Sequence, residues 1–151
     1  MIGSVQVSLV AHRPGGPPLQ GELIRRLAHR EQVEDCLPGD APGRSERVVF
    51  RTVRLQEFRD GSEPSEDMAA ATRDALLSLA VFLGEQDAGL LGQLGDSGIR
   101  VRVFVSLYMN RDQFELTLPA PLLRSAGRLG WDVELISNDI SVEQALAWGA
   151  T

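Results

Sequence analysis

The residues of this chain that could act as nucleophiles lack the neighbours that a catalytic site requires. Ser97 stands in the segment GDSG at residues 95–98, letters that also surround the nucleophile of chymotrypsin-like proteases. Such a serine needs a histidine base held by a carboxylate. His12 and His29 lie in no recognisable partner motif, and a chain of 151 residues is too short for a double β-barrel. The sequence therefore predicts that Ser97 belongs to a tight turn before a strand.

Cys36 and the remaining candidate groups give no catalytic, metal or cofactor signature either. Cys36 is the single cysteine, and it could be a nucleophile only if a histidine met it in space. Zinc sites need three or four ligands at metal spacing, and neither CxxC nor HExxH occurs. The glycines between residues 89 and 98 do not form a phosphate-binding loop. We expect no catalytic residue, metal or cofactor, although twenty-one acidic residues leave a carboxylate pair as an open alternative.

The strongest functional signal is an alternating strand over residues 99–109. One face carries valines, leucine and methionine and is the expected core face. The other face carries Arg102, Phe104, Ser106 and Tyr108, a mixture of cationic and aromatic side chains that is enriched at binding sites. Either this face is an exposed partner-binding patch, or a helix covers it.

The elements around this strand follow the order βαβαββαβ. Period-two alternation predicts strands, and one-sided apolar stripes predict amphipathic helices. Both faces of the second strand carry apolar side chains, so its buried face is undecided. The expected strands cover residues 4–12, 47–55, 99–109, 114–118 and 131–135; the expected helices cover 19–28, 68–83 with Ser62 or Ser65 as its cap, and 119–129, with a further turn at 88–94 and a last short helix from Ser141, and residues 36–46 are an expected loop.

This pattern predicts one α+β domain spanning residues 1–151. We expect a four- or five-stranded antiparallel or mixed sheet packed by two or three helices. The helix at 68–83 should pack on the sheet and bury a set of apolar side chains from both: Leu76, Leu79, Phe82, Val101, Val103 and Val105. No stretch is apolar enough for a membrane span, and the start of the chain lacks signal-peptide features. With one cysteine, these features favour a cytoplasmic protein.

The charge is unevenly spread along the chain. Up to Arg59 there are nine arginines and seven acids, a net charge of +2; from Asp60 there are six and fourteen, a net charge of −8. An acidic surface repels nucleic acid and attracts a basic partner. We therefore expect a protein partner, and we place Asp132, Glu134 and Asp139 among its contacts. The absence of lysine most simply reflects a GC-rich genome.

The layout resembles the four-two-seven-nine family of bacterial domains of unknown function. The resemblance is carried by the loop LPGD at residues 37–40 and by FELTLPAPLLRSAGRLGWDVELI over residues 114–136. Phe50 stands where that family's second strand would have tryptophan. Small α+β families of this sort look like immunity proteins of bacterial toxin systems. The resemblance thus implies a non-enzymatic protein-binding module that neutralises a toxin, and a small enzyme with a carboxylate-based site is the alternative.

Overall fold

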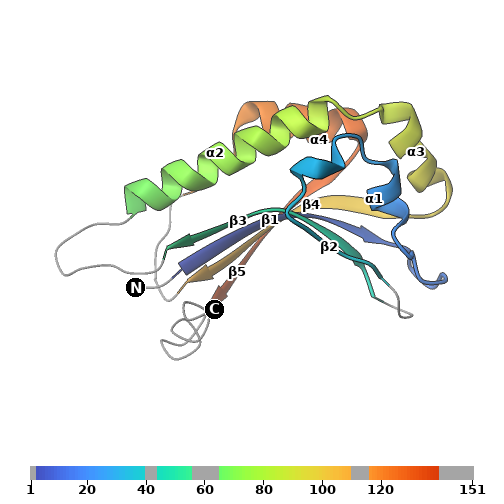
Figure 1. The fold of residues 1–151 in the computed structure, drawn as a ribbon, viewed down its shortest axis with the longest axis horizontal. Coiled ribbons are helices and arrows are strands. Elements are labelled where there is room, and N and C mark those ends of the chain that lie inside the picture. The colour runs from blue at the N-terminus through green and yellow to red at the C-terminus, as the bar shows by residue number, and fades with distance from the viewer. Residues whose placement is uncertain (1–2, 40–43, 56–64, 110–115, 140–151) are drawn as a thin grey trace.

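The chain folds into a layer of helices and a layer of β-strands (Figure 1). The computed structural model describes residues 3–39, 44–55, 65–109 and 116–139. The strands are β1 (Gly3–His12), β2 (Asp35–Leu37), β3 (Glu46–Leu55), β4 (Arg100–Met109) and β5 (Asp132–Asp139), and the helices are α1 (Glu22–Arg26), the 3₁₀ turn η1 (Arg30–Gln32), α2 (Ser65–Gly84), α3 (Ala88–Asp96) and α4 (Ala120–Leu129). The α+β class is confirmed.

The five strands form a mixed sheet in the order β2-β3-β1-β4-β5. β1 pairs antiparallel with β3 and with β4, whereas β4 and β5 are parallel. A parallel neighbour requires a crossover connection, and α4 supplies it between β4 and β5. β1 therefore lies between strands from both halves of the chain, and the two oppositely charged halves are interleaved in space.

A β-bulge in β3 decides which side chains of this strand face the helices, a point that the sequence left undecided. Val7 pairs with Arg51 while the next residue, Ser8, pairs with Val49, so Phe50 is the extra residue on β3. The bulge places Phe50 on the helix side, where its ring lies 5.1 Å from that of Phe82. Val49 is buried too, but it belongs to the opposite face of the sheet.

The main core lies between the sheet and the helices. Leu76, Leu79 and Phe82 of α2 and Val103 and Val105 of β4 are all fully buried and belong to the same core cluster. This confirms the expected register of the alternating strand. Met68 and Met109, which the sequence also assigned to this core, have side chains outside the described residues.

The remaining elements differ from expectation where the sequence signal is short. α1 has only five residues because Gly21, at φ 85, precedes it and Leu27 is already extended. Cys36 and Leu37, expected in a loop, belong to the three-residue strand β2.

Residues 116–118 form no strand, which corrects the prediction of a strand for the described part of the 114–118 segment. α3 is a full helix capped by the Asp87 carboxylate, so four α-helices are described instead of two or three. The helix expected from Ser141 lies outside the described residues.

No single helix among the described residues is long and apolar enough to cross a bilayer. The helices α2 and α3 reach that length and composition only when they are taken together, as a pair bent by 89°.

Candidate functional site

The candidate site is the open face of the sheet, the face opposite the helices. All four described α-helices lie on one side of the sheet, and none of them covers the other side (Figure 1). The register places side chains from β3, β1, β4 and β5 on this open face, in rows that run across the strands. An antiparallel sheet commonly leaves one face to water, and that face is then expected to be polar.

Phe104 lies on the open face with two guanidinium groups over its ring. The guanidinium carbon of Arg47 on β3 is 5.3 Å from the centroid of the Phe104 ring, and that of Arg102 on β4 is 5.7 Å from it. Arg47 also donates a hydrogen bond of 3.0 Å to the Gln6 side chain. Because these arginines lie across the ring, Phe104 is only 8% exposed although no described helix covers it.

Two further apolar side chains and two serines surround Phe104. Val10 and Val49 are buried on this face and do not belong to the helix-side core. Ser8, directly opposite Phe104 on β1, is fully buried, and so is Ser106 on β4. Neither serine hydroxyl has a hydrogen-bond partner. A buried hydroxyl left unpaired costs about 1–3 kcal/mol, so the centre of this face is not optimised for stability of the isolated chain.

The acidic residues that the sequence analysis expected to bind a partner lie on β5. Asp132 pairs in register with Arg102, and Glu134 pairs with Phe104. A Glu134 carboxylate oxygen lies 3.0 Å from the Arg102 guanidinium, an ion pair with both side chains partly exposed. Asp139 pairs with Met109, a position on the opposite face, and its side chain lies outside the described residues. Tyr108 is half-buried on the open face and has partners of its own.

The structure thus brings together five of the six residues selected from the sequence for two separate reasons. Arg102, Phe104 and Tyr108 came from strand alternation, whereas Asp132 and Glu134 came from charge. They share one face because β5 adds to β4 in parallel register. Of the two alternatives left open for this face, the described helices support the uncovered one, because none of them lies over it (Figure 1).

Sequence reasoning missed the contribution of the N-terminal half to this face. Val10, Arg47 and Val49 complete the surroundings of Phe104, but they lie 55 or more positions earlier in the chain. Alternation in residues 4–12 placed Val10 among the polar positions of its strand, which was the available signal. Arg47 and Val49 carried no signal because the face of their strand was undecided.

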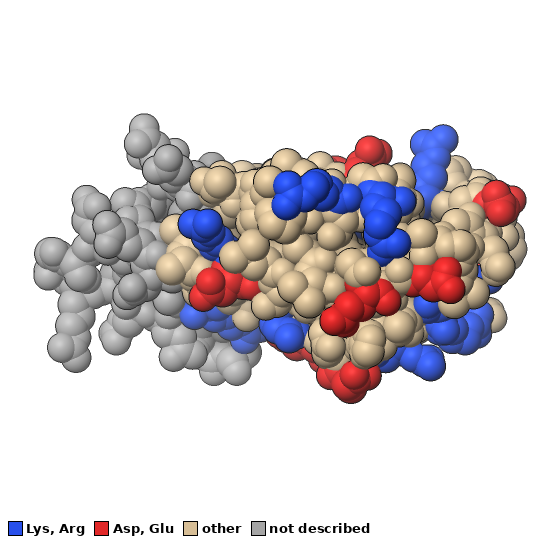
Figure 2. Space-filling view, turned by 90° about the horizontal axis from the view of Figure 1, so that it is seen from above, with Lys and Arg blue, Asp and Glu red and all other residues tan. Residues whose placement is uncertain are grey.

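The charges do not divide the molecule into a basic and an acidic side. Arg54, Arg100 and the two arginines beside Phe104 lie on the open face, together with carboxylates on the edge strands β2 and β5. On the helix side, arginine and carboxylate side chains are intermixed (Figure 2). This mixing follows from the position of β1 between β3 and β4.

The groups considered for catalysis are separated in the structure. Cys36 packs toward the helix-side core, and His12 lies at the end of β1 on the open face, opposite Arg100. Burial, followed by the negative charges of Glu46 and Asp35, raises the pKa of the Cys36 thiol, which disfavours the nucleophilic thiolate. Ser97 is exposed at the C-terminal cap of α3, as the turn interpretation predicts. Among the described residues, no three His, Cys, Asp or Glu side chains are grouped as metal ligands.

With this geometry established, the chain was compared with known proteins. Family models, curated proteins and solved structures gave no significant match. The resemblance to the four-two-seven-nine family therefore stays a prediction from the sequence.

Proposed function

We propose that this protein is a protein-binding module and that the open face of the sheet is its binding surface. The supporting observation is Phe104, a buried ring with the guanidinium groups of Arg47 and Arg102 over it, on a face that no described helix covers. Arginine and aromatic side chains dominate the energetics of protein interfaces, and guanidinium is less strongly hydrated than ammonium. A partner therefore removes little water from this site and gains a preformed apolar centre.

The charge pattern favours a partner segment that carries carboxylates beside apolar side chains. Arg54 and Arg100 are exposed on this face, and neither forms an ion pair with a described carboxylate. They lie beyond opposite ends of the apolar centre, opposite Ser4 and His12 of β1. A basic partner, the expectation from net charge, would instead approach the β5 carboxylates. Nucleic acid is disfavoured because two guanidinium groups already lie over the Phe104 ring, 5.3 and 5.7 Å from its centroid, where a base would stack.

An immunity protein that neutralises a toxin is the more specific form of this proposal, and the sequence resemblance supports it. The enzyme alternative has less support. Glu46, the one fully buried carboxylate among the described residues, accepts hydrogen bonds from the backbone N–H groups of Leu23 and Ile24 at 2.8 and 3.0 Å. That carboxylate is thereby engaged in holding α1.

The test uses the product of the neighbouring reading frame as the partner, with growth rescue on co-expression and calorimetric titration as the readouts. Arg54→Glu together with Arg100→Glu should weaken binding at least about tenfold, because two exposed charges on the binding face are reversed. Arg25→Glu together with Arg30→Glu is the matched control, since both are exposed in the helix layer. Equal effects of the two pairs would remove the open face as the binding surface. The double variant Asp132→Arg with Glu134→Arg distinguishes a basic partner from an acidic one. It should weaken the binding of a basic partner and should not weaken that of an acidic partner.

A further inference from the structure

The strand β5 forms one edge of the sheet, and it is a long edge strand. It runs over the eight residues Asp132–Asp139 and stands at the end of the order β2-β3-β1-β4-β5. Apart from the backbone of β4, no described backbone group hydrogen-bonds to it. Alternate N–H and C=O groups of an edge strand point away from the sheet, where another strand can pair with them. The described part of β5 is therefore a template for the addition of a strand.

The opposite edge of the sheet is protected against such pairing. β2 has only three residues, and the Asp35 carboxylate accepts the N–H of Cys36 at 2.8 Å. Beyond the stretch that pairs with β2, the Glu34 carboxylate accepts the N–H of Thr52 on β3 at 3.0 Å. Short edge strands and charged side chains are common protections against strand addition. β5 is long and contains no proline, so the two edges of the sheet differ.

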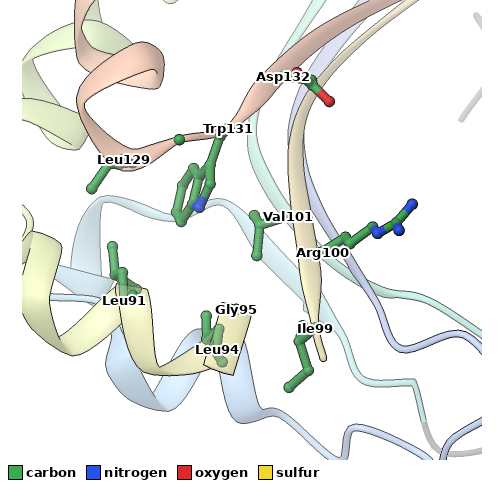
Figure 3. Close-up of a pocket in the computed structure, with 11 residues that line it drawn as sticks. Leu91, Leu94, Gly95, Ile99, Arg100, Val101, Leu129, Trp131 and Asp132 are labelled. Atoms are coloured by element: carbon green, nitrogen blue, oxygen red, sulfur yellow. The ribbon is translucent and has the colours of Figure 1, made fainter. Parts of the chain in front are cut away.

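The free edge at β5 carries an exposed leucine on its helix side. Figure 3 shows where the strand begins: the Trp131 ring points toward the helix layer, and the Asp132 side chain points to the opposite side of the sheet. By alternation, Val133 and Leu135 lie on the helix side and Glu134 lies on the open face. Val133 packs against the core, whereas Leu135 is 43% exposed.

The helix α4 adds a second exposed leucine on the same flank. α4 contacts α2 and β5. Ser125 and Arg128 face α2, because they donate hydrogen bonds to the carbonyls of Ala80 and Leu83. Leu123 is two positions before Ser125, which is about 200° of rotation around the helix. Leu123, 47% exposed, therefore points away from α2, toward the flank at which β5 ends the sheet.

The sequence of β5 allows a second copy of the same strand to pair with it. In an antiparallel pair centred on Leu135, the two Leu135 residues are directly opposed on the helix side. On the open face, Glu134 then stands opposite Ile136 of the second copy, and Asp132 stands opposite Asn138. No two acidic positions of the strand are opposed in this register.

The neighbouring registers are less favourable. A pair centred one residue earlier would oppose the two Glu134 carboxylates, and like charges directly opposite are destabilising. A pair centred one residue later would place each Leu135 opposite Ser137. The Glu134 carboxylate also lies 3.0 Å from the Arg102 guanidinium of its own chain, which reduces repulsion between the copies. The register centred on Leu135 thus joins two leucines without opposing carboxylates.

We propose that two copies of this chain associate through β5, in an antiparallel pair centred on Leu135 that continues the sheet across both copies. The two Leu135 side chains meet on the helix side, flanked by Leu123 of each α4, and burial of this apolar surface favours association. The contact is isologous, since each copy contributes the same residues. Both open faces lie on the same side of the dimer. The dimer does not depend on the protein-binding function proposed above.

Analytical ultracentrifugation of the intact chain tests the association. We expect a monomer–dimer equilibrium with a Kd of about 1–100 µM, because each copy contributes only one strand and one helix flank. Leu135→Lys removes the apolar contact and opposes two like charges, so it should weaken association at least about tenfold. Leu37→Lys is the matched control, at an exposed leucine of the opposite edge strand, and should leave the Kd unchanged. If Leu135→Lys does not fold, Leu123→Lys replaces it.

A chain that stays monomeric well above this concentration range would overturn the proposal. Loss of association in Leu37→Lys with none in Leu135→Lys would also overturn it, because the contact would then lie at the β2 edge.

Disulfide cross-linking tests the register. Cys36 is the single cysteine, so Cys36→Ser gives a background without thiols. In that background Leu135→Cys places two thiols on opposed residues with Cα atoms about 4.5–5.5 Å apart, a separation that a disulfide spans. Ser137→Cys is the control, because the two copies of residue 137 are offset by four residues, about 13 Å along the strand. Oxidised glutathione should produce a covalent dimer of the Leu135→Cys chain only. Equal or faster coupling of the Ser137→Cys chain would overturn the proposed pairing.

Discussion

Gln86 and Ala28 are joined by two hydrogen bonds, although 58 positions separate them in the chain. The Ala28 N–H donates to Gln86 Oε1 at 2.7 Å, and Gln86 Nε2 donates to the Ala28 carbonyl at 3.0 Å. Nε2 also donates to the carbonyl of Phe82 in α2. One buried amide thus ties the segment after α1 to the end of α2 and satisfies backbone groups on both.

Replacing Gln86 tests this connection. Gln86→Ala leaves both polar groups of Ala28 without a partner, and we expect the free energy of unfolding to fall by about 1–3 kcal/mol. The urea midpoint measures this change. Gln93→Ala is the matched control, because Gln93 is exposed on α3, and its midpoint should stay near that of the parent. Equal midpoints for both variants would show that the Gln86 bonds add nothing to stability.

Glu46 should be as important for α1 as Gln86 is for the segment after it. Its carboxylate accepts two backbone N–H groups at the start of a helix that has no side-chain cap of its own. In Glu46→Gln one oxygen remains, but the new amide group faces the second N–H as a competing donor. We expect a loss of about 1–3 kcal/mol in urea unfolding. The exposed Glu31, changed to Gln, is the control. A stability loss shared by Glu31→Gln would contradict a specific role for Glu46.

Cys36 should react slowly with alkylating agents in the folded protein. Burial and the negative charges of Glu46 and Asp35 raise the pKa of its thiol. The thiolate fraction between pH 7 and 8 is therefore smaller than that of a free cysteine, and the reaction with iodoacetamide should rise with pH only above the usual range. Unfolding in urea removes the burial and separates Glu46 from the thiol, so the same chain is its own control. Faster alkylation in the folded state near pH 7 would revive a nucleophilic role.

The sequence alone determined the elements whose residue pattern is long and regular. Alternation over residues 100–109 decided which side chains of β4 enter the core, because a strand directs successive side chains to opposite faces whatever its neighbours are. Gly130, in the left-handed region at φ 73, likewise ends α4 by a local backbone requirement. Such signals need no knowledge of the rest of the chain.

Only the tertiary structure decided the elements and surfaces that depend on distant partners. The three residues of β2 form a strand because β3 offers them hydrogen bonds, and the bulge at Phe50 follows from the register with β1. The surroundings of Phe104 include Arg47 from β3 and Glu134 from β5, two strands that are not adjacent to each other in the sheet. Strand order brings these side chains together, and no local pattern encodes strand order, because pairing is chosen by the free energy of the whole sheet.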